Sequence, residues 1–210
     1  MSRRMTAQVG DTLISSAARK AALRRQLRQV RAAIPQAQRV TAARRATRQL
    51  LRELPSRCRI AIYLSVRSEL STAPLRIALA RAGHQVFVPL TMRDWRLRFV
   101  PLDRNTVLRR RGPLQLPEPV SRRHLKTARA FDVILVPLLG FDADGGRLGN
   151  GGGYYDRALA GSRVGRKPQR IGYAYALQEV GELPIEAFDV RLDAVVTERG
   201  LRRFQKLPTD

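Results

Sequence analysis

The sequence predicts a single three-layer α/β domain, in which a mostly parallel open sheet carries helices on both faces. Short apolar runs alternate with segments of helical spacing along most of the 210 residues. Several of these runs are apolar at nearly every position, which is typical of strands buried on two faces. Sheets of this kind bind ligands beyond the carboxyl ends of their strands, so we expect functional residues directly after strands.

Two helices are expected to come before the first strand. Residues 16–34 have apolar side chains at helical spacing, and Pro35 ends that helix or opens a second one that runs to about residue 54. No repeat or low-complexity linker divides the chain. We therefore expect three parts: a flexible N-terminal extension at 1–15, one α/β domain at 16–200 and a C-terminal tail at 201–210.

The later elements follow from apolar runs and helical spacing. The run at 131–137 is the most apolar and is expected at the centre of the sheet, while 97–101 alternates and is expected nearer an edge. Residues 103–130 have weak structural signals and are expected to form a basic connection. Two further helices are expected at 70–82 and 153–159. The predicted strands are 59–64, 85–89, 97–101, 131–137, 170–174 and 193–197.

The composition is unusual in its charge. Forty basic residues oppose 17 acidic ones, which gives a formal net charge of +23, and residues 1–60 contain only two of the acidic ones. Such an excess attracts anions, either nucleic acid or a small molecule that carries phosphate. Proteins that bind single-stranded nucleic acid line the binding groove with aromatic side chains, and this chain has no aromatic residue before Tyr63. The alternative is a set of solvated helix faces rich in arginine.

Cysteine content and hydropathy indicate a cytoplasmic protein. A single cysteine, Cys58, excludes an intramolecular disulfide and suits a reducing compartment. The apolar runs are shorter than the roughly 20 residues that cross a bilayer, and residues 1–15 lack the apolar stretch of a secretory signal. We expect no membrane partner. We also expect a monomer, because no exposed apolar helix stands out.

A glycine-rich segment follows the strand expected at 131–137. Its glycines allow backbone N–H groups to converge on an anion, Arg147 adds a bidentate phosphate donor, and the Asp156 carboxylate suits a magnesium ion beside phosphates. The segment is neither a Walker A loop nor a complete Gly-x-Gly-x-x-Gly motif. Spacing alone leaves phosphate binding and a flexible helix-capping loop equally open. Residues 147–157 read Arg-Leu-Gly-Asn-Gly-Gly-Gly-Tyr-Tyr-Asp-Arg.

Residues 147–156 closely resemble the signature segment of the 5-formyltetrahydrofolate cyclo-ligases, also called methenyltetrahydrofolate synthetases. Other segments match in the family's order across about residues 17–199. Lys20–Arg24 resembles its N-terminal Lys-x-x-x-Arg helix, and Tyr63–Thr72 resembles its first strand and the glutamate that follows. Leu183–Pro184 and Phe188–Glu198 are similar to its C-terminal segment. The glycine motif is specific, whereas the other matches are weak alone.

The resemblance implies an enzyme that uses ATP and Mg²⁺ to convert 5-formyltetrahydrofolate to 5,10-methenyltetrahydrofolate. Phosphorylation of the formyl oxygen lets it leave as phosphate when the neighbouring folate nitrogen attacks. Such an enzyme positions two ligands and neutralises phosphate charge, and it needs no side-chain nucleophile. The arginine excess would attract an anionic substrate, with or without a polyglutamate tail. Two alternatives are a related protein with the same ATP-binding fold and another substrate, and a basic RNA-binding protein.

The resemblance also implies roles for individual residues. Trp95 either forms an aromatic platform for the folate or packs against neighbouring side chains without a role in binding. Some family members carry cations where this chain has Asn150 and Gly152. The catalytic positions are Arg147, Tyr154 and Asp156, and the magnesium ligands are Asp156 and Asp189. The folate-contacting positions are Leu64, Glu69, Asn150, Gly151, Gly152, Gly153 and Tyr154. The ATP-contacting positions are Lys20, Arg24, Arg147, Leu148, Gly149, Asn150, Gly151, Gly152, Gly153, Tyr154 and Tyr155.

Overall fold

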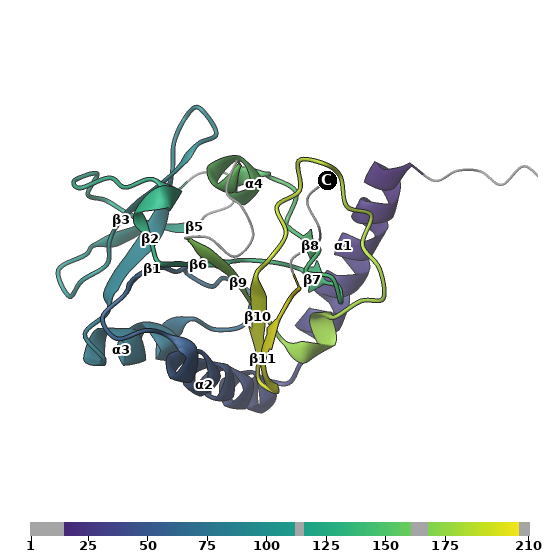
Figure 1. Ribbon diagram of the computed structural model, residues 1–210, viewed down its shortest axis with the longest axis horizontal. Helices are drawn as coiled ribbons and strands as arrows, with labels where there is room; N and C mark the ends of the chain where they lie inside the picture. The colour runs from purple at the N-terminus through teal and green to yellow at the C-terminus, as the bar shows by residue number, and fades with distance from the viewer. Residues whose placement is uncertain (1–14, 112–115, 161–167, 206–210) are drawn as a thin grey trace, which may run out of the picture.

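The computed structural model describes residues 15–111, 116–160 and 168–205, and its centre is a seven-stranded sheet (Figure 1). The strand order is β11-β10-β9-β6-β1-β2-β3. The four inner pairings are parallel, and the two edge pairings, β10 with β11 and β2 with β3, are antiparallel. The strands are β1 Arg59–Ala61, β2 Gln85–Thr91, β3 Leu97–Pro101, β6 Val133–Val136, β9 Gln169–Tyr173, β10 Ala194–Thr197 and β11 Gly200–Arg203.

The predicted fold class is confirmed, because apolar layers cover both faces of the sheet. Along β1, Ile60 joins the core beneath the helices α2 (Gln36–Glu53) and α3 (Ala73–Arg81), whereas Ala61 joins the opposite core. The opposite core includes Leu159 of the short helix α4 (Tyr154–Leu159). Figure 1 shows α2 and α3 below the sheet and α4 above it. The strand β6 is central and fully buried, as its apolar run predicts.

The helix α1 (Ser16–Ala32) lies beside the loops that follow the sheet strands rather than flat on the sheet (Figure 1). It begins where the Ser15 hydroxyl accepts the Ala18 N–H at 3.3 Å. Leu27 packs with Leu139, Leu148 and Leu183 in a small separate core. One side of α1 is therefore fixed against loops at the carboxyl ends of the strands, where the site is expected.

Two parts of the fold differ from the sequence expectation. Residues 103–130 form a β-hairpin of β4 (Leu108–Arg111) and β5 (Leu116–Pro119), followed by the 3₁₀ turn η1 (Ala128–Ala130). These strands have four residues each and no apolar alternation, so they carry no strand signal in the sequence. In addition, β11 extends the sheet past residue 200, where the sequence predicts a tail.

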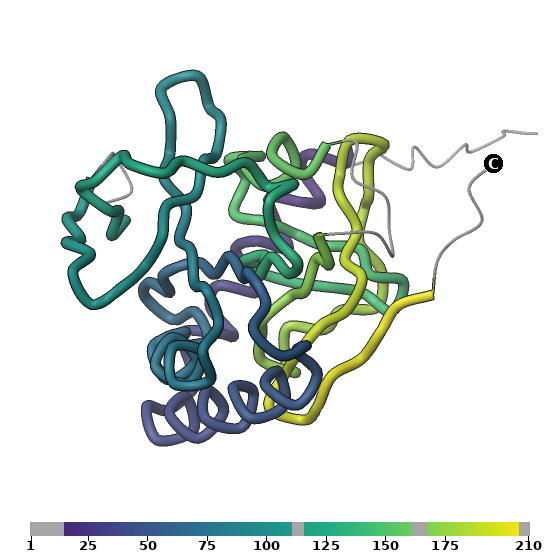
Figure 2. The backbone as a smooth tube through the Cα atoms, turned by 60° about the vertical axis from the view of Figure 1, so that its left-hand side comes forward, coloured from purple at the N-terminus to yellow at the C-terminus, as the bar shows by residue number. Residues whose placement is uncertain are grey.

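Shorter elements complete the chain. They are β7 (Gly140–Phe141), β8 (Arg147–Leu148) and the 3₁₀ turn η2 (Ala176–Gln178). Figure 2 shows the connection between β2 and β3 standing away from the sheet, at the end opposite α2 and α3. The expected N-terminal extension lies, apart from Ser15, outside the described residues, as does the end of the chain after residue 205. Among the described helices, none is both long and apolar enough to cross a membrane.

Candidate active site

The expected site residues lie on loops that leave the parallel strands at the same edge of the sheet. Glu69 follows β1, the glycine-rich loop at 149–153 follows β6 and β8, and Asp189 follows β9. Parallel strands place their carboxyl ends together, which explains why segments far apart in the sequence meet here. The helix α1 closes one side of the site with a row of cationic side chains.

The glycine-rich loop depends on backbone conformations that favour glycine. Gly151 has φ +105°, and Gly153, the residue that precedes α4, has φ +62°. No side chain caps the first turn of α4, so its N–H groups stay available to an anion. The Arg157 guanidinium donates to the Gly152 carbonyl at 2.6 Å and braces the loop from the side. The helix has only six residues, so the N–H groups of the loop, more than a helix dipole, are the candidate anion donors.

The cationic row on α1 reaches the loops rather than solvent. Lys20 is 7% exposed and donates to Glu186 and Asp189, both at 2.6 Å. One turn later, the Arg24 Nε donates to the Gly149 carbonyl at 2.9 Å. Burial alone lowers the pKa of Lys20, but the bonds to Asp189 and Glu186 outweigh that effect and raise it. The predicted pair Lys20 and Arg24 therefore lies against the loops of the candidate site.

Two further α1 arginines extend this row, and the prediction missed both as site residues. Arg28 donates to the Asn150 carbonyl at 3.4 Å. Arg31 is 5% exposed and donates to the Ser68 hydroxyl at 3.1 Å, next to Glu69 in the sequence. Their spacing from Lys20 and Arg24 is helical, so a stripe was visible in the sequence, but only contacts across the fold distinguish it from a solvated face.

The two expected magnesium ligands are brought to adjacent places. The Asp156 Oδ1 accepts from the Arg147 guanidinium and from the Val190 N–H, the latter at 3.1 Å, and Asp189 directly precedes Val190. Within the hydrogen bonds of the described residues, Asp156 uses only Oδ1 and Asp189 only Oδ2, so each keeps one oxygen. Across the same residues, no group of three carboxylate, His or Cys side chains gathers to hold a metal by itself.

Glu69 is a partly buried residue, and its carboxyl group lies at the far end of this site. Its Oε2 accepts the Val66 N–H at 2.9 Å. Burial raises the pKa of Glu69, although the Val66 N–H, the Arg31 charge and the Asn150 side chain each oppose the rise. Asn150 belongs to the glycine-rich loop, so Glu69 and that loop are direct neighbours. Leu64, the other expected position after β1, is half-buried and packs against the main core.

Two polar atoms inside the site have no hydrogen-bond partner among the described residues. They are the Tyr155 hydroxyl and the Arg147 Nε, both fully buried. Burial raises the pKa of the Tyr155 hydroxyl, and the nearby Glu69 carboxylate raises it further, while Arg147 opposes this. The hydroxyl is therefore protonated at neutral pH. Buried donors without partners are rare in folded proteins, so both groups are candidate contacts for a ligand.

An aromatic platform borders the site. Trp95, in the connection between β2 and β3, stacks on Tyr154 with ring centroids 5.6 Å apart and an interplanar angle of 29°. The Arg157 guanidinium lies over both rings and donates to the Trp95 carbonyl at 3.3 Å. Trp95 remains 60% exposed, so this stack is not core packing. Arg157 and Glu186 were missed by the prediction, and only the folded contacts distinguish them from other surface charges.

These features define an α/β domain in which a glycine-rich loop, suited to an anion, lies beside a partly buried carboxyl group. A family model described as the 5-formyltetrahydrofolate cyclo-ligase family matches residues 16–198. The chain belongs to that family. It is 38% identical over 141 residues to the 5-formyltetrahydrofolate cyclo-ligase of Escherichia coli, across 66% of this chain and 76% of the relative. It is 32% identical over 189 residues to that of Mycolicibacterium smegmatis, across 87% and 95%.

Solved structures of similar proteins support the same assignment. The 5,10-methenyltetrahydrofolate synthetase of Aquifex aeolicus superposes with a TM-score of 0.74 at 27% identity, and covers 90% of this chain and 95% of its own. That of Mycoplasma pneumoniae superposes with a TM-score of 0.67 at 26% identity, covering 85% and 98%. The similarity thus extends over nearly the whole domain.

Proposed function

We propose that this chain converts 5-formyltetrahydrofolate to 5,10-methenyltetrahydrofolate with ATP as phosphoryl donor and Mg²⁺ as metal. The observation that carries the proposal is the proximity of Glu69 to Asn150, whose side chain favours the ionised form of that carboxyl group and so opposes the rise of its pKa. Glu69 matches the folate-contacting position of the family, and Asn150 is part of the anion-binding loop. Transfer of a phosphoryl group between two ligands requires adjacent sites, and this proximity supports such an arrangement.

The ATP phosphates would lie between α1 and the glycine-rich loop. Lys20 has three ammonium hydrogens and uses two on Glu186 and Asp189, so one is left for a phosphate oxygen. Arg24 uses its Nε on the loop and keeps its terminal N–H groups. Arg147 keeps the unpartnered Nε. These cations and the loop N–H groups would neutralise the charge that moves during transfer.

The residues present fit a magnesium ion bound together with phosphate. Magnesium in such sites takes one or two protein carboxylates, and phosphate oxygens and water complete its coordination. Asp156 and Asp189 each have one oxygen outside the bonds described above. The absence of a third acidic ligand nearby, within the described residues, suits this arrangement. When bound, the ion would neutralise phosphate charge and orient the phosphate to be transferred.

The chemistry needs position more than a reactive side chain. The formyl oxygen attacks the terminal phosphorus, and the bond from that phosphorus to the ADP oxygen breaks. The neighbouring folate nitrogen then attacks the formyl carbon, loses its proton and closes the ring, while the carbon–oxygen bond breaks and phosphate leaves. Glu69 would accept hydrogen bonds from the N–H edge of the pterin and fix its orientation. The protonated Tyr155 hydroxyl would donate to an oxygen of either ligand.

The proposal is tested by following the near-ultraviolet absorbance of the methenyl product with purified protein, 5-formyltetrahydrofolate and MgATP, each omitted in turn. We expect product only when all three are present. The Asp156→Asn variant should lose at least about a hundredfold in kcat/KM, or about 2.7 kcal/mol of transition-state stabilisation. The exposed Glu182→Gln is the matched control and should retain full activity. Product formed without ATP would contradict the proposal.

A further inference from the structure

The outer face of α2 carries a second cluster of arginines, separate from the site above. Arg44, Arg45, Arg48 and Arg52 are all exposed. None of the four makes an ion pair or a side-chain hydrogen bond with any described residue. The cations of α1 discussed above, in contrast, each have a partner. We call these four residues and the surface around them the α2 arginine face.

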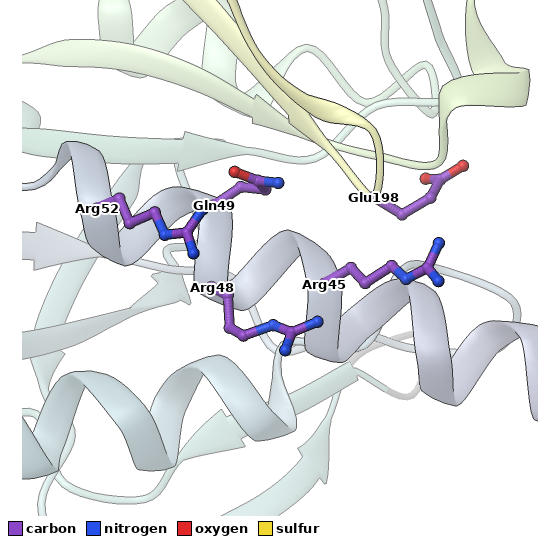
Figure 3. Close-up of a pocket in the computed structure, with 5 residues that line it drawn as sticks. All are labelled: Arg45, Arg48, Gln49, Arg52 and Glu198. Carbon is purple, nitrogen blue, oxygen red and sulfur yellow. The ribbon is translucent and has the colours of Figure 1, made fainter.

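Among the described residues, few acidic groups lie near this face, and one of the two is already ion-paired. Glu53, the only acidic residue of α2, accepts from Arg203 at 2.9 Å. Glu198, between β10 and β11, accepts the Ala176 N–H at 3.0 Å. Figure 3 shows Glu198 across from Arg45, beyond the helix that carries the arginines. Glu198 keeps its charge, since its partner is a neutral N–H group, but one carboxylate against four arginines leaves the α2 arginine face with a net positive charge.

This arrangement is unfavourable for the isolated helix. Arg44, Arg48 and Arg52 follow one another at four-residue spacing, which places like charges on neighbouring turns. Each such pair destabilises a helix by about 0.2–0.5 kcal/mol, whereas glutamate at these positions would stabilise it. Two hollows adjoin this row. One, of about 370 Å³, is lined by Arg45, Arg48, Gln49, Arg52 and Glu198 (Figure 3), and one, of about 550 Å³, by Thr41, Arg44, Arg45, Thr47, Arg48 and Pro74.

We propose that the α2 arginine face binds the phosphate backbone of double-helical nucleic acid without reading its sequence. Arg44, Arg48 and Arg52 extend over eight residues of helix, which is about 12 Å at a rise of 1.5 Å per residue. That length covers several phosphates of a duplex, which carries about one charge per 1.7 Å of its axis. Arginine binds phosphate through a planar, bidentate fork. The hollows on both sides of the row leave room for the backbone to approach.

Other occupants fit this face less well. A single strand is bound largely by stacking of its bases on aromatic side chains, and neither α2 nor α3 contains an aromatic residue. The core of a protein–protein interface usually combines arginines with aromatic side chains, and neither helix supplies an aromatic one here. The face also lies on the opposite side of the sheet from α4, so a bound duplex would leave the active site open.

Fluorescence anisotropy of a labelled 20-base-pair DNA duplex tests the proposal with the full-length protein. The triple variant R44Q/R48Q/R52Q should bind at least tenfold more weakly at about 50 mM salt. Its plot of log affinity against log salt should be shallower by about 0.9 for each phosphate that the protein no longer neutralises. Glutamine keeps the helix propensity, and the variant should retain its cyclo-ligase rate, which shows that it is folded.

The matched control is R104Q/R122Q/R123Q, which removes three exposed arginines from the segment between β3 and β6. It lowers the net charge equally and should bind nearly as tightly as the parent protein. Equal weakening in both triple variants would overturn the proposal, because binding would then follow net charge alone. No binding by the parent protein, tighter binding of a 20-nucleotide single strand, or displacement of the duplex by polyglutamate at equal charge concentration would also overturn it.

Discussion

Lys20 and Asp189 are 169 positions apart in the sequence, and their side chains meet at 2.6 Å. This ion pair, with the second bond from Lys20 to Glu186, connects the first helix to the loop after β9. It encloses the glycine-rich loop from one side. The same pair joins an expected ATP contact to an expected magnesium ligand, so binding and folding are coupled at this point.

Replacement of Lys20 should affect both stability and ATP binding. Lys20→Met leaves Asp189 and Glu186 without their cation, and we expect a loss of about 2 kcal/mol in the free energy of unfolding. This is less than the roughly 3–5 kcal/mol of a fully buried pair, because the Glu186 side chain is 38% exposed. Urea unfolding measures the loss. The KM for MgATP should rise at least tenfold, and a variant with unchanged stability and KM would contradict the role.

Glu69 should make stability depend on pH. Because burial raises its pKa above the ordinary value of 4.5, the folded state binds the proton more tightly than the unfolded state. Its contribution to stability is therefore fully present below pH 4.5 and is lost as pH rises through the raised pKa. Urea unfolding from pH 4 to 8 should show this decline in the parent protein and a smaller one in Glu69→Gln. The exposed Glu182→Gln should decline like the parent.

Gly153 should be required for the shape of the loop. A Cβ at this position would lie 2.8 Å from the Arg157 Nη1, and its φ of +62° disfavours other residues by about 1–2 kcal/mol. Gly83→Ala is the matched control, since Gly83 has φ +77° and open space around it. Thermal unfolding should show similar destabilisation of both variants. Only Gly153→Ala should weaken ATP binding in calorimetry, and equal ATP affinity in both would contradict the role of the loop.

Trp95 should contribute to folate binding and little to stability. Its ring is exposed and stacks on Tyr154, so Trp95→Ala removes a surface for a flat ligand while the core stays intact. We expect a fivefold to tenfold rise in the KM for 5-formyltetrahydrofolate, or about 1–1.4 kcal/mol, with an unchanged KM for ATP. Trp95→Phe should restore most of the affinity. Ile77→Ala on the exposed side of α3 is the control, and a matching KM change there would contradict this role.

Much of the fold follows from local sequence patterns, and most of the site does not. The apolar run of β6 and the start of α1 at Ser16 are evident from neighbouring residues, and the structure confirms both. In contrast, Glu186 has no local signal, and the helical spacing of Arg31 does not distinguish it from a solvated residue. Only contacts with distant segments bring these two side chains to the candidate site. Glycine composition indicated the anion loop, but its proximity to Glu69 arises only from the parallel order of β1 and β6.

The β4–β5 hairpin was missed for a related physical reason. Its strands are short, and Arg109, Arg110 and Arg111 replace the apolar alternation that a strand buried on one face would show. Pairing between the two strands, with β5 lying against β2, stabilises them despite this composition. The charged composition of these segments predicted a loop, but pairing with neighbouring strands makes them β-strands.

The most direct test of the proposed mechanism follows the formyl oxygen itself. 5-Formyltetrahydrofolate labelled with oxygen-18 in the formyl group is converted with MgATP by the full-length protein, and the released phosphate is analysed by mass spectrometry. The mechanism predicts that phosphate carries the label, because the formyl oxygen is phosphorylated before the ring closes. Methenyl product accompanied by unlabelled phosphate would contradict it, since the oxygen would then have left by another route.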